Sequence, residues 1–129
     1  MTYVEDIMLS LTRFGQSTHG ALVRVLGSEE LVSNVSIATL MLLHRDGPQR
    51  PTQIAELTGL TSGGATKLIT RLESAGLVDR ESGVVPDDGR AIVVSLTKVG
   101  SEKMNEAVTA VSPQVDALID ALGVSHADA

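Results

Sequence analysis

The segment from residue 50 to residue 97 constrains the fold of this chain most strongly, because it pairs two short helical patterns across a tight glycine turn. Pro51 suits the first position of a helix, where its φ is already helical and its missing N–H would be unpaired. Gly59 is typical of the left-handed residue that ends a helix. Thr61 can then cap the next helix by accepting from a backbone N–H one turn later. The pattern predicts a helix, a sharp turn and a second helix.

The second of these helices, residues 62–75, is the most informative element of the sequence. Its apolar residues recur at spacings of three and four, which predicts one buried face, and they are Ala65, Leu68, Ile69 and Leu72. The rest of its surface holds small, hydroxyl-bearing and cationic residues, namely Ser62, Gly63, Gly64, Thr66, Lys67, Thr70 and, at the margin, Arg71. A face that needs only solubility usually contains better helix formers such as Glu, Gln and Ala.

These residue types suit contact with DNA. Small residues let a backbone approach closely, hydroxyl groups hydrogen-bond to phosphates or base edges, and cations neutralise phosphate or bind guanine. We therefore interpret residues 62–71 as a DNA-contacting face. The alternative is a polar, solvated face that contains poor helix formers by chance.

Two short strands are predicted after Gly76, at residues 77–80 and 91–96. The ten residues between them are rich in turn formers and charge, and they are too many for a tight hairpin. A helix-turn-helix followed by such a hairpin predicts a mainly α fold with a small β-wing, the winged helix-turn-helix, whose second helix enters a DNA groove.

Two stretches of this region carry a family resemblance. The sequence LTSGGATKLITRLESAGLVDR, followed by PDDGRAIVVSLT, resembles the MarR (multiple antibiotic resistance regulator) family of transcription regulators. The family's wing pattern is Asp-Pro-x-Asp-x-Arg, followed by a strand that ends in Leu-Thr. Pro86, Asp88 and Arg90 match this pattern and so do residues 96–97, whereas Val85 stands where the family has its first Asp. The resemblance covers residues 34–122.

The resemblance implies a site and partners. Arg90 is expected to reach toward the minor groove of DNA, with Asp88 holding it in place. The family further implies a homodimer, and a small, often aromatic or anionic, effector that binds between the dimer region and the DNA-binding head and releases the DNA. From the helix geometry itself, Arg50 and Thr52 are expected to touch phosphate at the start of the first helix of the pair.

The chain is expected to form a single domain over residues 1–129. A helical stripe at residues 4–26 and another after Thr97 predict dimerisation helices at residues 1–33 and 98–122, flanking a DNA-binding head at residues 34–97. Asn34 is predicted to cap the first helix of the head, and Pro113 to kink the last helix. The family's usual further C-terminal helix is not expected here, so the predicted dimer interface is smaller. The alternative is that both stripes only close the core of a monomer.

Net charge opposes this interpretation. The chain has a formal charge of −6, whereas DNA-binding domains are usually basic. The excess of acid lies outside the head, since residues 34–96 contain six cations and seven acids. A near-neutral head with acidic flanks suits a specific binder with weak non-specific affinity. A winged-helix module that binds a protein partner through its acidic surface, and does not bind DNA, is the alternative.

Other chemistry finds little support in the sequence. The three histidines lie far apart and there is no cysteine, so we expect no metal site, no cofactor and no disulfide. No nucleophile elbow or phosphate-binding glycine loop is present, and we expect no enzyme. No apolar run approaches the roughly 20 residues of a membrane span. The N-terminus lacks the basic start of a signal peptide, so a cytoplasmic location is expected.

Overall fold

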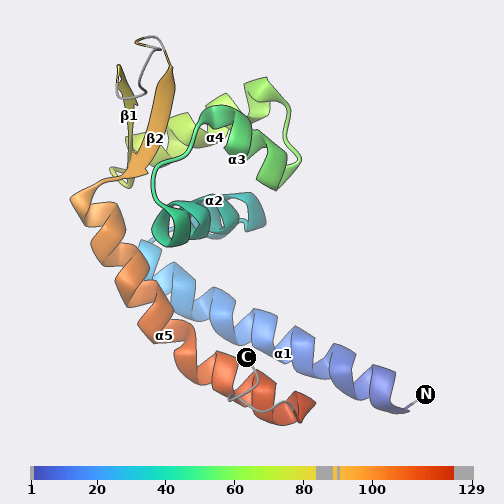
Figure 1. Cartoon of the computed structure of the whole chain (residues 1–129). Coiled ribbons are helices and arrows are strands. Elements are labelled where there is room, and N and C mark those ends of the chain that lie inside the picture. Colours follow the sequence, from blue (N-terminus) through green and yellow to red (C-terminus); the bar gives the residue numbers. More distant parts are fainter. Residues whose placement is uncertain (1, 84–88, 90, 124–129) are drawn as a thin grey trace.

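The computed structural model describes residues 2–83, 89 and 91–123, and this part of the chain is mainly helical with one small hairpin (Figure 1). The predicted fold class is confirmed. The elements in chain order are α1 (Thr2–Leu26), the 3-10 helix η1 (Glu30–Val32), α2 (Asn34–Asp46), α3 (Pro51–Thr58), α4 (Ser62–Ser74), β1 (Val78–Ser82), β2 (Ile92–Leu96) and α5 (Lys98–Leu122).

Local capping explains where most of these helices begin and end. Gly59 has φ 74° and ends α3, and the Thr61 hydroxyl accepts from the Gly64 N–H at 3.1 Å to begin α4. Thr97 caps α5 in the same way. The predicted cap of α2 is wrong by one residue, because Ser33 is the extended residue whose hydroxyl accepts from the Ser36 N–H, and Asn34 is already helical.

The hairpin forms a two-stranded antiparallel sheet in which Val78 lies opposite Leu96 and Ser82 lies opposite Ile92. Gln49 extends it by a bridge to Val94, donating to the Val94 carbonyl at 2.9 Å and accepting at 2.7 Å. Each strand starts one residue later than predicted, and β1 extends two residues further. Leu77 is not part of β1. Its carbonyl accepts from the N–H of Thr97, which follows β2 and lies outside the two strands.

The core lies between the head helices, the hairpin and the first half of α5. It contains no aromatic residue, in keeping with a sequence that has a single Tyr and a single Phe. Its buried members are Leu40, Leu43, Ile54, Leu68, Ile69, Leu72, Leu77, Val78, Val94, Met104 and Ala107. Because α4 supplies three of them and both strands contribute, the core fixes the angle of α4 relative to the hairpin.

The remaining parts of α1 and α5 lie side by side and extend away from the head as an arm (Figure 1). Helix α2 lies between this arm and the pair of helices α3 and α4 (Figure 1). Helix α5 continues through Pro113, and its ribbon bends near its middle (Figure 1). In the N-terminal half of α1, several large apolar side chains are exposed, namely Tyr3, Val4, Ile7, Met8, Leu9 and Leu11. Among the described residues, no helix combines the length and apolarity that a membrane span requires.

Candidate nucleic-acid interface

Helix α4 buries the face that the sequence predicted and exposes the other. Ala65, Leu68, Ile69 and Leu72 are all at most 2% exposed and anchor the helix in the core. The opposite face is therefore held toward solvent, and its exposed residues are Ser62, Gly63, Thr66, Lys67 and Thr70. The packing of four buried side chains makes this face rigid, which a sequence-reading surface requires.

The two glycines of α4 occupy different surroundings. A Cβ on Gly63 would meet nothing within 4 Å, so this residue opens the surface of the helix. A Cβ on Gly64 would lie 3.3 Å from the Thr61 hydroxyl and 3.4 Å from the Leu60 Cβ. Gly64 therefore packs against the turn between α3 and α4, whereas Gly63 can admit another molecule close to the backbone.

Arg80 is the residue of this face that sequence reasoning missed. Its guanidinium reaches from β1 across α4, donating to Glu73 Oε1 at 2.6 Å, to Thr70 Oγ1 at 2.9 Å and to the Thr66 carbonyl at 3.2 Å. The two-residue repeat of a strand could have predicted its inward orientation, because Arg80 lies on the same face of β1 as the buried Val78. Arg80 ties the wing strand to the exposed face of α4.

Arg71, predicted at the margin of the same face, forms an ion pair with Glu30 on η1, with Nε and Oε1 3.0 Å apart. Arg45 is paired as well, donating to both carboxylate oxygens of its neighbour Asp46 at 2.8 and 2.9 Å. These hydrogen bonds lower the pKa of Asp46 and raise the pKa of Arg45. Within the described part of the head, Arg50 and Lys67 remain as the cations without an ion-pair partner.

The start of α3 presents the other predicted contact residues, Arg50 and Thr52, both exposed. The Arg50 N–H donates to Gln53 Oε1 at 2.7 Å, while the Gln53 N–H donates to the Arg50 carbonyl at 3.0 Å. This reciprocal pair fixes the first turn and leaves the Arg50 side chain available. The predicted wing residues Asp88 and Arg90 lie outside the described residues.

A large cavity lies between the arm and the head. It has a volume of about 800 Å³ and is bounded by α1, η1, α2 and α5. Most of its lining is apolar, and Asp116 and His19 are the ionisable residues among those that line it in the described structure. His19 Nε2 lies 2.7 Å from Glu29 Oε2.

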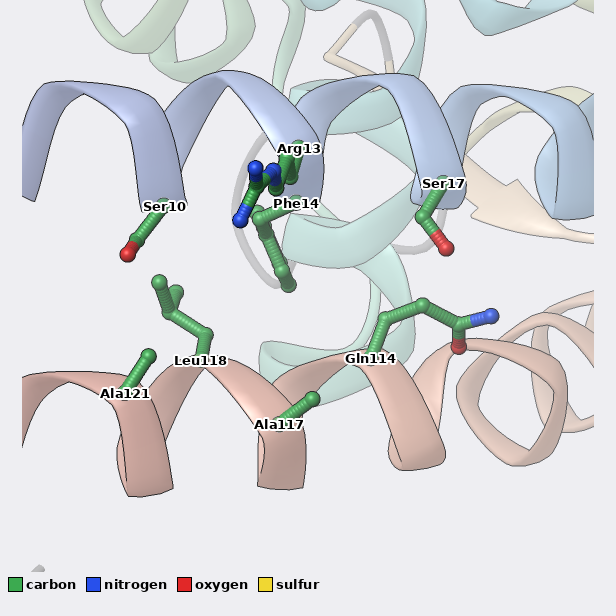
Figure 2. Close-up of a pocket in the computed structure, with 8 residues that line it drawn as sticks. All are labelled: Ser10, Arg13, Phe14, Ser17, Gln114, Ala117, Leu118 and Ala121. Atoms are coloured by element: carbon green, nitrogen blue, oxygen red, sulfur yellow. The ribbon is translucent and has the colours of Figure 1, made fainter. Parts of the chain in front are cut away.

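A smaller hollow of about 230 Å³ separates α1 from α5 farther along the arm. Ser10 and Ser17 point from α1 toward Leu118 and Gln114 on α5 (Figure 2). The α5 side also contains Ala117 and Ala121, whose small side chains leave the space between the helices open. No group of three His, Cys, Asp or Glu side chains is close enough to hold a metal ion in the ranges 2–83 and 91–123.

A capped helix-turn-helix, an exposed and rigid second helix and a β-hairpin wing together define the winged helix-turn-helix class. The model of the MarR family matches residues 32–92, which include α2, α3, α4, β1 and the first residue of β2. Fold and family are those of transcription regulators, not of enzymes.

One relative whose name states a role is similar to part of this chain. The chain is 40% identical over 53 residues to the HTH-type transcriptional regulator YcgE of Bacillus subtilis (strain 168). The match covers 41% of this chain, and it spans only a third (33%) of the length of that relative.

Two solved structures show the likeness over nearly the whole chain. RV1404 from Mycobacterium tuberculosis has a TM-score of 0.75 at 20% identity, covering 99% of this chain and 84% of that one. A mutant of E. coli MarR, complexed with operator DNA, has a TM-score of 0.63 at 19% identity, covering 91% of this chain and 81% of that one. At such identities these structures establish the shared fold.

Proposed function

We propose that this chain is a transcription regulator that binds a pseudo-palindromic DNA sequence as a homodimer and responds to a small molecule. One observation carries the proposal: α4 fixes its apolar face in the core and exposes a face of small, hydroxyl-bearing and cationic residues. This face occurs in the fold that E. coli MarR has in its complex with operator DNA. Repression is the effect we propose, because a bound dimer would obstruct transcription from the same DNA.

The proposed contacts divide into two kinds. Residues 62–71 of α4 would lie in the major groove, where side chains can distinguish all four base pairs. Arg50 and Thr52 would touch phosphate from the start of α3, and Arg90, positioned by Asp88, would reach the minor groove from the wing. Because three of the head's cations are held by acidic neighbours, few charges remain for phosphate, and affinity for random DNA should be weak.

We propose residues 34–97 as the DNA-binding head and residues 1–33 and 98–122 as the dimerisation helices. The support is the exposed apolar surface of α1, where Ile7 is 40% and Met8 is 63% exposed. Contiguous apolar surface of this kind marks an interaction site. A two-fold partner would cover it with the same residues of its own, and would place two recognition helices about one turn of DNA apart, roughly 34 Å.

The cavity of about 800 Å³ supports a small-molecule effector, because its size is in the usual range for ligand sites and it joins the arm to the head. The chemistry of its lining points to an apolar, uncharged ligand, since neither Lys nor Arg is among the described residues that line it. Of the aromatic or anionic effectors that the family resemblance implies, an anionic one would find neither Lys nor Arg there. An occupant would change the packing of α2 against α5 and so the placement of the head.

The test is a salt titration of binding to two duplexes, one from the DNA upstream of the chain's own gene and one of random sequence. Specific recognition predicts tight binding to the upstream duplex and weak, strongly salt-dependent binding to the random one. Equal and weak binding to both would reject the proposal. It would favour the alternative that the acidic surface binds a protein partner, which the net charge of −6 supports.

A further inference from the structure

Beyond the first turn of each helix, the helical threonines of the described chain make the same hydrogen bond, and Thr70 is the exception. In six cases the hydroxyl donates to the carbonyl four residues earlier, at 2.7 to 3.1 Å; the residues are Thr12, Thr18, Thr39, Thr58, Thr66 and Thr109. For Thr70 the corresponding carbonyl is that of Thr66, and Arg80 Nη2 donates to it at 3.2 Å. The same Nη2 also donates to the Thr70 hydroxyl at 2.9 Å.

The hydrogen-bond partner of each exposed hydroxyl decides whether that hydroxyl donates or accepts toward solvent. A carbonyl can only accept, so the Thr66 hydroxyl uses its hydrogen on the Ser62 carbonyl at 2.9 Å and offers lone pairs outward. A guanidinium can only donate, so the Thr70 oxygen accepts from Arg80. The hydroxyl hydrogen of Thr70 has no acceptor within the described residues. Thr66 can thus only accept from a partner in solvent, whereas Thr70 keeps its hydrogen available to donate.

We infer that these two residues, one helical turn apart, select bases of opposite chemistry, and that Arg80 is the positioning residue that makes Thr70 a donor. This inference rests on the proposed DNA binding by α4. In the major groove a donor is complementary to the keto oxygen of guanine or thymine, and an acceptor is complementary to the amino group of cytosine or adenine; N7 accepts from a donor in both purines and so does not distinguish them. The operator should therefore contain one position with a keto preference and a nearby position with an amino preference.

The experiment is selection of binding sites from a randomised duplex library, performed with the full chain and with variants. Thr70→Val keeps the shape of the side chain and removes the hydroxyl. It should abolish the keto preference at one position. In the wild type this preference is expected to be roughly fivefold, the discrimination of one neutral hydrogen bond. Thr70→Ser, the matched control, should keep that preference. Thr66→Val should abolish the amino preference at the other position and leave the keto position unchanged.

Arg80 provides the decisive variant. In Arg80→Met the Thr66 carbonyl no longer accepts from the guanidinium, so the Thr70 hydroxyl can donate to it as the other six threonines do to theirs. Thr70 then offers lone pairs, and the preference at its position should change from keto to amino. The double variant Thr70→Val, Arg80→Met should show no preference there. Glu73→Gln removes the ion pair with Arg80 while leaving Thr70 in place, and it should retain the wild-type preference.

The outcomes separate this inference from the proposed function. If the wild-type chain enriches no sequence, DNA recognition itself is wrong, and the inference falls with it. If the wild type enriches a motif and Thr70→Val retains every base preference, recognition stands and the inference is overturned. A uniform loss of affinity in Arg80→Met, with unchanged preferences, would also overturn it, because that is the result of a purely structural ion pair.

Discussion

Gly100 lies so close to Leu77 that a methyl group on Gly100 would overlap the Leu77 carbonyl oxygen. The same carbonyl accepts from the Thr97 N–H at 3.0 Å. The Thr97 hydroxyl donates to the Gly76 carbonyl at 2.6 Å and accepts from the Gly100 N–H at 2.9 Å. The first turn of α5 is therefore joined to the turn that follows α4, so the arm and α4 meet at one tightly packed junction.

This contact predicts that Gly100→Ala destabilises the fold. In a helix, alanine is ordinarily about 1 kcal/mol more stable than glycine. Here the neighbour is backbone, which cannot move without shifting β1, and overpacking typically costs about 1–3 kcal/mol. Chemical denaturation should show a net loss of stability. Unchanged or increased stability would mean that α5 does not lie against Leu77.

Gly63→Ala is the matched substitution in open space and should act in the opposite direction. A Cβ there meets nothing within 4 Å, so the helix should gain about 0.5–1 kcal/mol in stability. DNA affinity should nevertheless fall, because the added methyl group would separate the backbone of α4 from the groove. Denaturation and a binding titration on the same sample check both halves. A variant that is more stable and binds equally well would remove Gly63 from the interface.

Arg50→Ala should weaken binding to every DNA sequence by a similar factor, because a phosphate contact carries no base information. The slope of log affinity against log salt should decrease in magnitude by about 1. Selection from a random library should return the same motif as the wild type. A changed motif would instead assign Arg50 to base contact.

Replacing Ile7 and Met8 together by Asn and Gln should weaken the proposed homodimer. Both side chains are exposed on α1, so the change removes apolar surface without opening the core. Sedimentation velocity should show the variant dissociating at concentrations where the wild type remains dimeric. Leu57→Gln, a similarly exposed apolar residue on α3 in the head, is the control and should leave the association unchanged.

Arg90→Ala should cost about 1–3 kcal/mol in DNA binding while changing thermal stability little. The reason is that the family resemblance places this residue at the minor groove, where its charge meets phosphate-rich surroundings. Thermal unfolding and DNA titration of the same variant check the prediction. A loss of folding stability equal to the loss of binding would show a structural ion pair with Asp87 or Asp88.

Much of the fold could be predicted from the sequence, because the decisive interactions are local. The Thr61 and Thr97 caps join residues three apart, the left-handed turn at Gly59 requires only its own backbone, and the buried stripe of α4 is a helical repeat. The wrong prediction of the α2 cap also concerned a local interaction. Ser33 and Asn34 are both good caps, and the choice between them depended on the extended path of the chain after η1.

The chemistry of the exposed face could not be predicted in the same way. The helical repeat predicted which residues face outward. Whether the Thr70 hydroxyl donates or accepts depends on Arg80, which lies ten residues further along the chain on another element. Likewise, the pairing of Arg71 with Glu30 and the cavity between α1, α2 and α5 join segments far apart in sequence. Sequence alone determined the elements and their faces, since backbone geometry acts over a few residues. Tertiary structure decided which charges are neutralised within the molecule, because that depends on the angles at which the core packs those elements.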